Sequence, residues 1–216
     1  MIIRARPLSP YAFRLISWAI RQVLRRNFKK LYLNKVILLP EHSYLVMSNH
    51  FSFWDGFLAF YLCNELIRKQ ISDGGLYVMV LEKQLQKNWW LRYSGAFSVS
   101  PGKSSVSESL AYAQEILNVP GNILLMYPQG NLESIYVRHI NLKEGILEII
   151  PGVKGKCQLI WCTTLIDYFE SLKPSIYFNV LSCGTNETFN FSDLSGQINE
   201  FHQSAIKSQF RFTREP

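Results

Sequence analysis

The chain has 216 residues, enough for one domain with a sizeable core, and its apolar content of 48% against a charged content of 18% favours extensive burial or a membrane-facing surface. No stretch approaches the roughly 18 to 20 consecutive apolar residues of a membrane-spanning helix, no signal peptide with a cleavage site is visible, and the four cysteines lack metal-ligand spacing, so we expect reduced core thiols in a cytoplasmic protein. The net charge of +7 comes from residues 1–30, which carry eight basic and no acidic side chains, while the remainder is near neutral.

The basic N-terminal segment has the pattern of an amphipathic helix. Ser9 and Pro10 predict its start, as a cap and a first helical residue. An apolar stripe at helical spacing faces one way and basic side chains face the other, with Leu15 and Trp18 on the polar side. We expect this helix to lie at the interface of an anionic membrane. An ordinary helix packed on the domain, with a solvated basic face, is the alternative, and a nucleic-acid arm is disfavoured because no nucleic-acid motif follows.

Residues 47–56 join a buried strand to a helix. The apolar run from Tyr44 to Ser48 predicts the strand, and a helical pattern begins near Asp55. Because the chain reverses between them, the side chains of His50 and Asp55 can meet. A carboxylate bonded to one imidazole nitrogen fixes the tautomer and leaves the other nitrogen as a base. The alternative for the same residues is a capping Asp55 and a partly buried His50 bonded to backbone.

Strand-like and helix-like segments alternate from residue 35 to residue 180. This alternation predicts an α/β fold, a single domain with a mixed, largely parallel central sheet flanked by helices and preceded by the basic helix. Such sheets carry their sites at the carboxyl ends of strands, where His50 would lie. We expect strands over 36–39, 44–48, 76–81, 97–99, 123–127, 159–164 and 175–181. We expect helices over 55–69, 83–90, 104–117 and 142–149, and a weaker one over 194–210 that covers a sheet edge.

Two further motifs follow in the middle of the chain. Residues 95–104 end in Gly-Lys-Ser, but a phosphate-binding loop requires glycine at position 97, which is Phe97. The strand over 123–127 runs into Pro128-Gln129-Gly130, a turn. A serine hydrolase is disfavoured because no Gly-x-Ser-x-Gly elbow is present.

Taken together, these motifs resemble the glycerolipid (lysophospholipid) acyltransferases over roughly residues 40–165. The resemblance implies that His50 and Asp55 form the catalytic dyad of that family. Gly95-x-Phe97 resembles the second block, Tyr127 to Gly130 the third, and Lys143-x-Gly145 the helix start that follows it. The family's Asp-Arg of the second block is replaced by Ser-Pro, the Glu of the third by Gln129, and its Thr-Arg by Asn-Leu. These departures favour an acceptor other than glycerol phosphate.

The resemblance implies transfer of a fatty acyl group from acyl-CoA or acyl carrier protein to a hydroxyl of a membrane-associated lipid, with no further cofactor and no metal. The alternative is an impaired lipid- or carrier-binding protein of the same fold. We expect a peripheral protein at the cytoplasmic face of the membrane that binds lipid, with acyl carrier protein as a candidate partner and no nucleic acid. The expected parts are a membrane-surface helix over 1–34, an acyltransferase domain over 35–185 and a tail over 186–216 packed on it. Expected substrate-binding residues are Asn49, Ser52, Gly95, Phe97, Ser98, Lys103, Tyr127, Pro128, Gln129 and Gly130, and expected membrane-contact residues are Arg14, Trp18, Arg21, Arg25 and Arg26.

Overall fold

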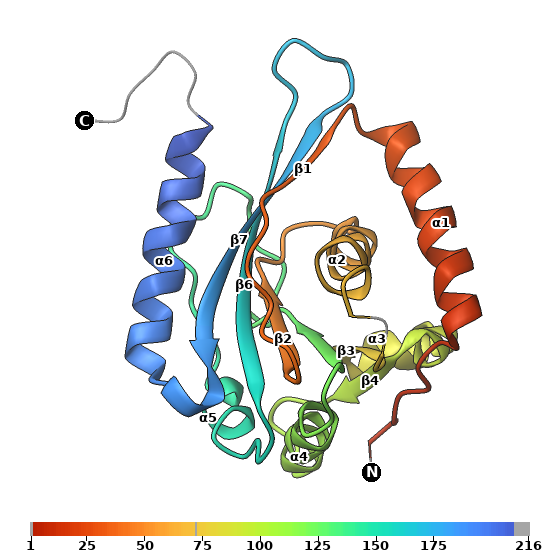
Figure 1. The fold of residues 1–216 in the computed structure, drawn as a ribbon, viewed down its shortest axis with the longest axis vertical. Coiled ribbons are helices and arrows are strands. Elements are labelled where there is room, and N and C mark those ends of the chain that lie inside the picture. Colours follow the sequence, from red (N-terminus) through yellow and green to blue (C-terminus); the bar gives the residue numbers. More distant parts are fainter. Residues whose placement is uncertain (1, 72, 210–216) are drawn as a thin grey trace.

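A computed structural model describes residues 2–71 and 73–209 and shows one seven-stranded sheet between two layers of helices (Figure 1). The strand order is β1-β7-β6-β2-β5-β3-β4, and every neighbouring pair is parallel except the antiparallel β6 and β7. The expected α/β fold with a mixed, largely parallel sheet is therefore confirmed. The strands are β1 (Leu31–Leu33), β2 (Ser43–Ser48), β3 (Leu76–Leu81), β4 (Ala96–Val99), β5 (Ile123–Met126), β6 (Cys157–Asp167) and β7 (Ser175–Thr185). The helices are α1 (Pro10–Asn27), α2 (Asp55–Cys63), α3 (Glu82–Lys87), α4 (Val106–Leu117), α5 (Gly145–Ile149) and α6 (Phe191–Ser208), with short turns η1 (Asn64–Arg68), η2 (Trp89–Ser94) and η3 (Asn186–Thr188).

The central strand β2 is buried on both faces, and a hydrophobic core lies on each side of it. Alternate side chains of β2 point to opposite faces, so Tyr44 and Val46 belong to one core and Leu45 and Met47 to the other. Helices α1 and α2 cover the first face, and α4, α5 and α6 cover the second (Figure 1). This two-sided cover explains the continuous apolar run in β2, which is typical of parallel strands.

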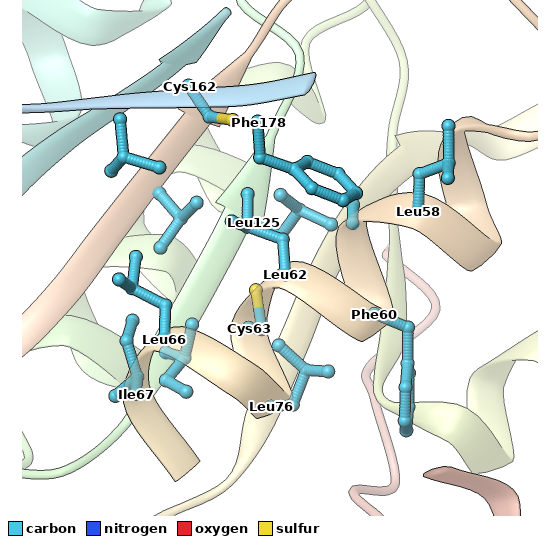
Figure 2. Close-up of a cluster of buried hydrophobic side chains, with 14 of the residues drawn as sticks. Leu58, Phe60, Leu62, Cys63, Leu66, Ile67, Leu76, Leu125, Cys162 and Phe178 are labelled. Carbon is cyan, nitrogen blue, oxygen red and sulfur yellow. The ribbon is translucent and has the colours of Figure 1, made fainter. Parts of the chain in front are cut away.

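Helix α2 supplies much of the first core. Figure 2 shows Leu58 and Leu62 of α2 packed with Phe178 and Cys162 of the sheet. Each fully buried leucine of this kind contributes about 1.5 to 3 kcal/mol of hydrophobic stabilisation. Helix α2 passes directly into the π-helical turn η1 at Asn64, so the helix expected over 55–69 is present in two segments.

Helix α1 begins where the sequence predicts. The hydroxyl of Ser9 accepts the amide of Ala12 at 3.4 Å, and proline occupies the first turn. Phe13 on its inner stripe stacks on Phe60 of α2 with ring centroids 4.8 Å apart. Its outer side leaves Trp18 61% exposed, so only one face of α1 is needed to hold it on the domain.

The strand expected over 36–39 is wrong. The edge strand is instead β1, which pairs in parallel with β7. The backbone of the following segment is bound by one side chain, because Gln158 accepts from the amide of Leu39 at 2.9 Å and donates to the carbonyl of Ile37 at 2.9 Å. The side-chain amide of Gln158 thus takes the place of a neighbouring strand.

The C-terminal helix α6 covers a face of the sheet and not an edge, so that prediction is wrong. Leu194 and Ile198 are buried in the second core. The cap is Asn190, whose side chain accepts from the amides of Ser192 and Asp193. The expected helix end at residue 210 lies outside the described residues. Among the helices that the structure describes, none has both the length and the apolar composition required to cross a membrane.

Candidate active site

The predicted contact between His50 and Asp55 is present at the carboxyl end of β2. The Nδ1 atom of His50 lies 2.6 Å from Oδ2 of Asp55. A carboxylate only accepts hydrogen bonds, so Nδ1 carries the proton and Nε2 keeps its lone pair. The His50 side chain is 23% exposed whereas that of Asp55 is 3% exposed. The pair therefore has the form of a base that solvent or substrate can reach, oriented by a buried acid.

The turn between β2 and α2 is folded around the Asp55 carboxylate. Oδ2 accepts the amides of Phe51 at 2.7 Å and Ser52 at 2.9 Å in addition to the imidazole, and Oδ1 lies 3.3 Å from the Ser52 hydroxyl. That hydroxyl also accepts the amide of Trp54 at 2.9 Å. Asp55 thus closes its own turn, and Ser52, expected to contact substrate, bonds to the carboxylate and the turn.

Tyr127, directly after β5, forms one wall of the site. Its ring stacks on that of His50 with centroids 4.4 Å apart, and its hydroxyl donates to the backbone carbonyl of Asp55 at 2.9 Å. Burial, with a smaller contribution from the Asp55 charge, raises the pKa of Tyr127 well above its usual value. The phenol therefore stays neutral and serves as a fixed hydrogen-bond donor.

Two neighbouring side chains expected to bind substrate are hydrogen-bonded to the protein. Both polar atoms of the Asn49 amide bond to the backbone of Thr164 in β6, donating to its carbonyl at 3.0 Å and accepting from its amide at 2.7 Å. Gln129 is buried, accepts the amide of His50 at 2.8 Å and donates to the carboxylate of Glu133. Asn49 therefore fixes the end of β2, and Gln129 contacts the backbone of the candidate base.

The structure does not bring the second block to the dyad. Gly95 lies at the amino end of β4, whereas His50 lies at the carboxyl end of β2. A Cβ at Gly95 would lie 2.0 Å from the carbonyl oxygen of Leu76. Phe97 is fully buried in the second core, away from α2. Ser98 pairs with the N-terminal segment, since its hydroxyl accepts the amide of Ile3 at 2.8 Å and its amide donates to the Ile3 carbonyl at 3.0 Å. Turn geometry, core packing and edge protection explain these three residues.

Lys103 lies past the carboxyl end of β4 and is engaged by an acid. Its ammonium lies 2.9 Å from Oε2 of Glu82, the first residue of α3, and the hydroxyl of Ser100 bonds to the same oxygen. These two hydrogen bonds, Ser100 first, lower the pKa of Glu82. The cation at this position is therefore paired with a carboxylate.

Lys143, which the site prediction omitted, lies beside the turn that follows β5. Lys143 donates its amide to the carbonyl of Pro128 at 2.8 Å, and its exposed side chain runs beside Gly130. Gly130 has a φ of 75°, which glycine adopts without strain. The sequence signal that could have identified Lys143 was the resemblance of Lys143-x-Gly145 to the family pattern.

The amides of the dyad turn are already used. Those of His50, Phe51, Ser52, Trp54 and Asp55 all donate to protein acceptors. These five amides are therefore not free to donate to an oxyanion that would develop on a substrate. Donors have to come from elsewhere around the site.

The expected membrane-contact residues divide into two groups. Arg21 is half-buried and paired with Glu65 of η1, so this ion pair joins α1 to η1. Arg14, Trp18, Arg25 and Arg26 are exposed. Tyr11, Leu15 and Trp18 form an outer apolar stripe on α1, at 82%, 66% and 61% exposure.

No group of three or more metal-ligating side chains occurs among residues 2–71 and 73–209. The cysteines there are unpaired thiols. Burial raises the pKa of Cys162 and of Cys183 to about 12, so neither is a thiolate near neutral pH.

One solved structure with a similar fold is that of the 1-acyl-sn-glycerophosphate (LPA) acyltransferase, PlsC, from Thermotoga maritima. The similarity covers 92% of this chain and 80% of that chain, with a TM-score of 0.59 and 14% sequence identity. No family model and no curated protein matches the sequence. The likeness is one of fold, and it extends over nearly the whole chain.

Proposed function

We propose that the protein is an O-acyltransferase that moves an acyl group from a thioester to a lipid hydroxyl. The observation that carries the proposal is the His50–Asp55 pair, with 2.6 Å between Nδ1 and Oδ2 and with Oδ2 fixed by two backbone amides. The pair lies at the carboxyl end of a parallel strand, where such sheets carry their sites. The fold shared with a lysophosphatidic acid acyltransferase agrees with this chemistry.

In the proposed reaction, Nε2 of His50 accepts the proton of the acceptor hydroxyl while its oxygen attacks the thioester carbonyl carbon. The negative charge of Asp55 stabilises the imidazolium that forms. Collapse of the tetrahedral intermediate breaks the carbon–sulfur bond, and the imidazolium returns its proton to the leaving thiolate. The thioester is acyl-CoA or acyl carrier protein, and the reaction needs no further cofactor.

We propose that the acceptor lacks a phosphate monoester. The positions that carry arginines in the resembling family hold Pro101 and Leu132 here, and Lys103 is paired with Glu82. Gln129 is neutral and already bonded on both sides. A lysolipid with another head group, a glycolipid, or a hydroxylated pigment or polyene would fit such a site.

We also propose peripheral binding to the cytoplasmic face of a membrane through α1. The outer stripe of Tyr11, Leu15 and Trp18 has no protein layer over it in the described structure, and Arg14, Arg25 and Arg26 lie exposed on the same helix. Aromatic and basic side chains in this arrangement suit the headgroup region of an anionic bilayer. A membrane-bound acceptor would then be near the enzyme.

The test is thiol release from acyl-CoA and from acyl carrier protein against a panel of lipid hydroxyl acceptors. We expect acceptor-dependent release by the wild type and a loss of about 10² to 10⁴ in rate in His50→Ala. The matched control is His42→Ala, since His42 lies just before the opposite end of β2. If no acceptor gives His50-dependent release while the protein binds acyl groups or vesicles, the protein is a lipid- or carrier-binding relative of the same fold. Saturable acylation of lysophosphatidic acid would contradict the proposed acceptor class.

A further inference from the structure

We propose that Gln129 and Glu133 are positioning residues that hold the backbone of His50, an inference that rests on the proposed acyl transfer. The two peptide groups that flank the Cα of His50 are both bound by this pair. The His50 amide donates to Oε1 of Gln129 at 2.8 Å, and the His50 carbonyl accepts the amide of Glu133 at 2.9 Å. We call this arrangement the His50 clamp, made of His50, Gln129 and Glu133.

The chemistry of the pair fixes which way the Gln129 amide points. A carboxylate can only accept, so Glu133 draws the NH₂ group of Gln129 toward itself. The oxygen of the same amide is then directed at the His50 amide. Gln129 is only 3% exposed, so water does not compete for either atom. Glu133 thereby fixes the Gln129 oxygen as the acceptor for the backbone amide of His50.

The clamp explains why residue 129 is glutamine in this chain and not glutamate. A glutamate at position 129 would place a second carboxylate at hydrogen-bond distance from Glu133, and two like charges at that separation repel. A glutamate at position 133 therefore requires a neutral hydrogen-bond donor such as glutamine at position 129. The acid that the resembling acyltransferases carry in this turn is found four residues later in this chain.

The loop that carries Glu133 is itself anchored to α6. Asn199 accepts the amide of Ile140 at 2.7 Å and donates to its carbonyl at 3.1 Å. His202 bonds through Nε2 to the carbonyl of Val137 at 2.8 Å. Two side chains of the C-terminal helix thus anchor the loop at Val137 and Ile140. This anchoring restricts the movement of Glu133 relative to His50.

The test compares four proteins in a double-mutant cycle, namely wild type, Gln129→Glu, Glu133→Gln and the variant with both changes. The single variants lose either the charge balance or the direction of the amide, and we expect kcat to fall about tenfold with KM little changed, because misplacement of a catalytic group slows chemistry more than binding. The double variant restores both side-chain hydrogen bonds with the roles exchanged, and we expect kcat to return to within about threefold of wild type. Glu200→Gln on the exposed side of α6 is the matched control.

Hydrogen exchange of the His50 amide, followed by NMR, reads the clamp without reference to activity. We expect slow exchange in wild type and the double variant and exchange about tenfold faster in Glu133→Gln. A double variant that is no faster in kcat than the slower single variant, or exchange rates that are equal in all four proteins, overturns the clamp. If wild type releases no thiol with any substrate, the proposed function fails and the exchange rates alone decide the clamp. If Gln129→Glu does not fold, recovery of Glu133→Gln by the second change carries the same test.

Discussion

Replacing Asp55 by asparagine isolates the charge of the dyad. The amides of Phe51 and Ser52 point at Oδ2, so the asparagine oxygen is held in that place and its NH₂ group faces the Ser52 hydroxyl. The oxygen still accepts the proton on Nδ1 of His50, so the tautomer and the ring orientation are retained. What the variant loses is the negative charge beside the imidazolium.

The magnitude follows from Coulomb's law. Unit charges about 4 Å apart interact by about 4 kcal/mol at an effective dielectric constant of about 20. Because the His50 side chain is 23% exposed, solvent screens part of this attraction, and we take about 2 to 4 kcal/mol for the imidazolium. At about 1.4 kcal/mol per factor of ten, kcat falls about 30- to 1000-fold.

The assay is thiol release at saturating donor and acceptor, with thermal unfolding of the same samples. We expect Asp55→Asn to be slow but nearly as stable as wild type, because its hydrogen bonds to the turn persist. Asp55→Ala should be slow and also destabilised, since it leaves the Phe51 and Ser52 amides without an acceptor. An Asp55→Asn protein with kcat within twofold of wild type would refute the role of the charge.

Three further changes test other parts of the molecule. Asn49→Ala leaves the amide and carbonyl of Thr164 unpaired, so the free energy of unfolding in urea should fall by about 2 to 6 kcal/mol, and a loss below about 1 kcal/mol would contradict this anchor. Burial lowers the pKa of His202 below its ordinary 6.5, so the unfolded state takes up the proton first as the pH falls. The free energy of unfolding should therefore decrease below about pH 6.5, and less steeply in His202→Gln; parallel curves would disprove this. Leu15→Glu with Trp18→Glu should reduce co-sedimentation with anionic vesicles about tenfold or more, and unchanged sedimentation would refute the membrane face of α1.

The contact between His50 and Asp55 could be predicted from the sequence because it is local. His50 and Asp55 lie in one turn, and that turn is fixed by the buried strand before it and the helix after it. The same holds for α1, because its N-cap residue and its apolar stripe lie within one continuous segment of the sequence. Hydrophobic periodicity also predicted six of the strands. Each of these strands buries side chains on one or both faces of the sheet, and this burial produces the apolar pattern in the sequence.

Contacts between distant segments were decided only by the tertiary structure. Gly95 and Phe97 matched a motif, yet the direction of β4 puts one at the far edge of the sheet and the other in the second core. Gln158 replaced a strand by binding the backbone of residues 37–39, which no local pattern indicates. Strand direction and side-chain reach depend on the whole sheet, so a motif alone could not place these residues.

The His50 clamp shows the same division. From the sequence, Gln129 was a departure from a family pattern and Glu133 had no role. In the fold, the parallel pairing of β2 with β5 sets their carboxyl ends side by side, and the loop after β5 then reaches His50. The sequence determined that the candidate base His50 would meet Asp55, because their spacing is short. Only the packed sheet decided which side chains hold that base in place, because their contacts cross about 80 residues of chain.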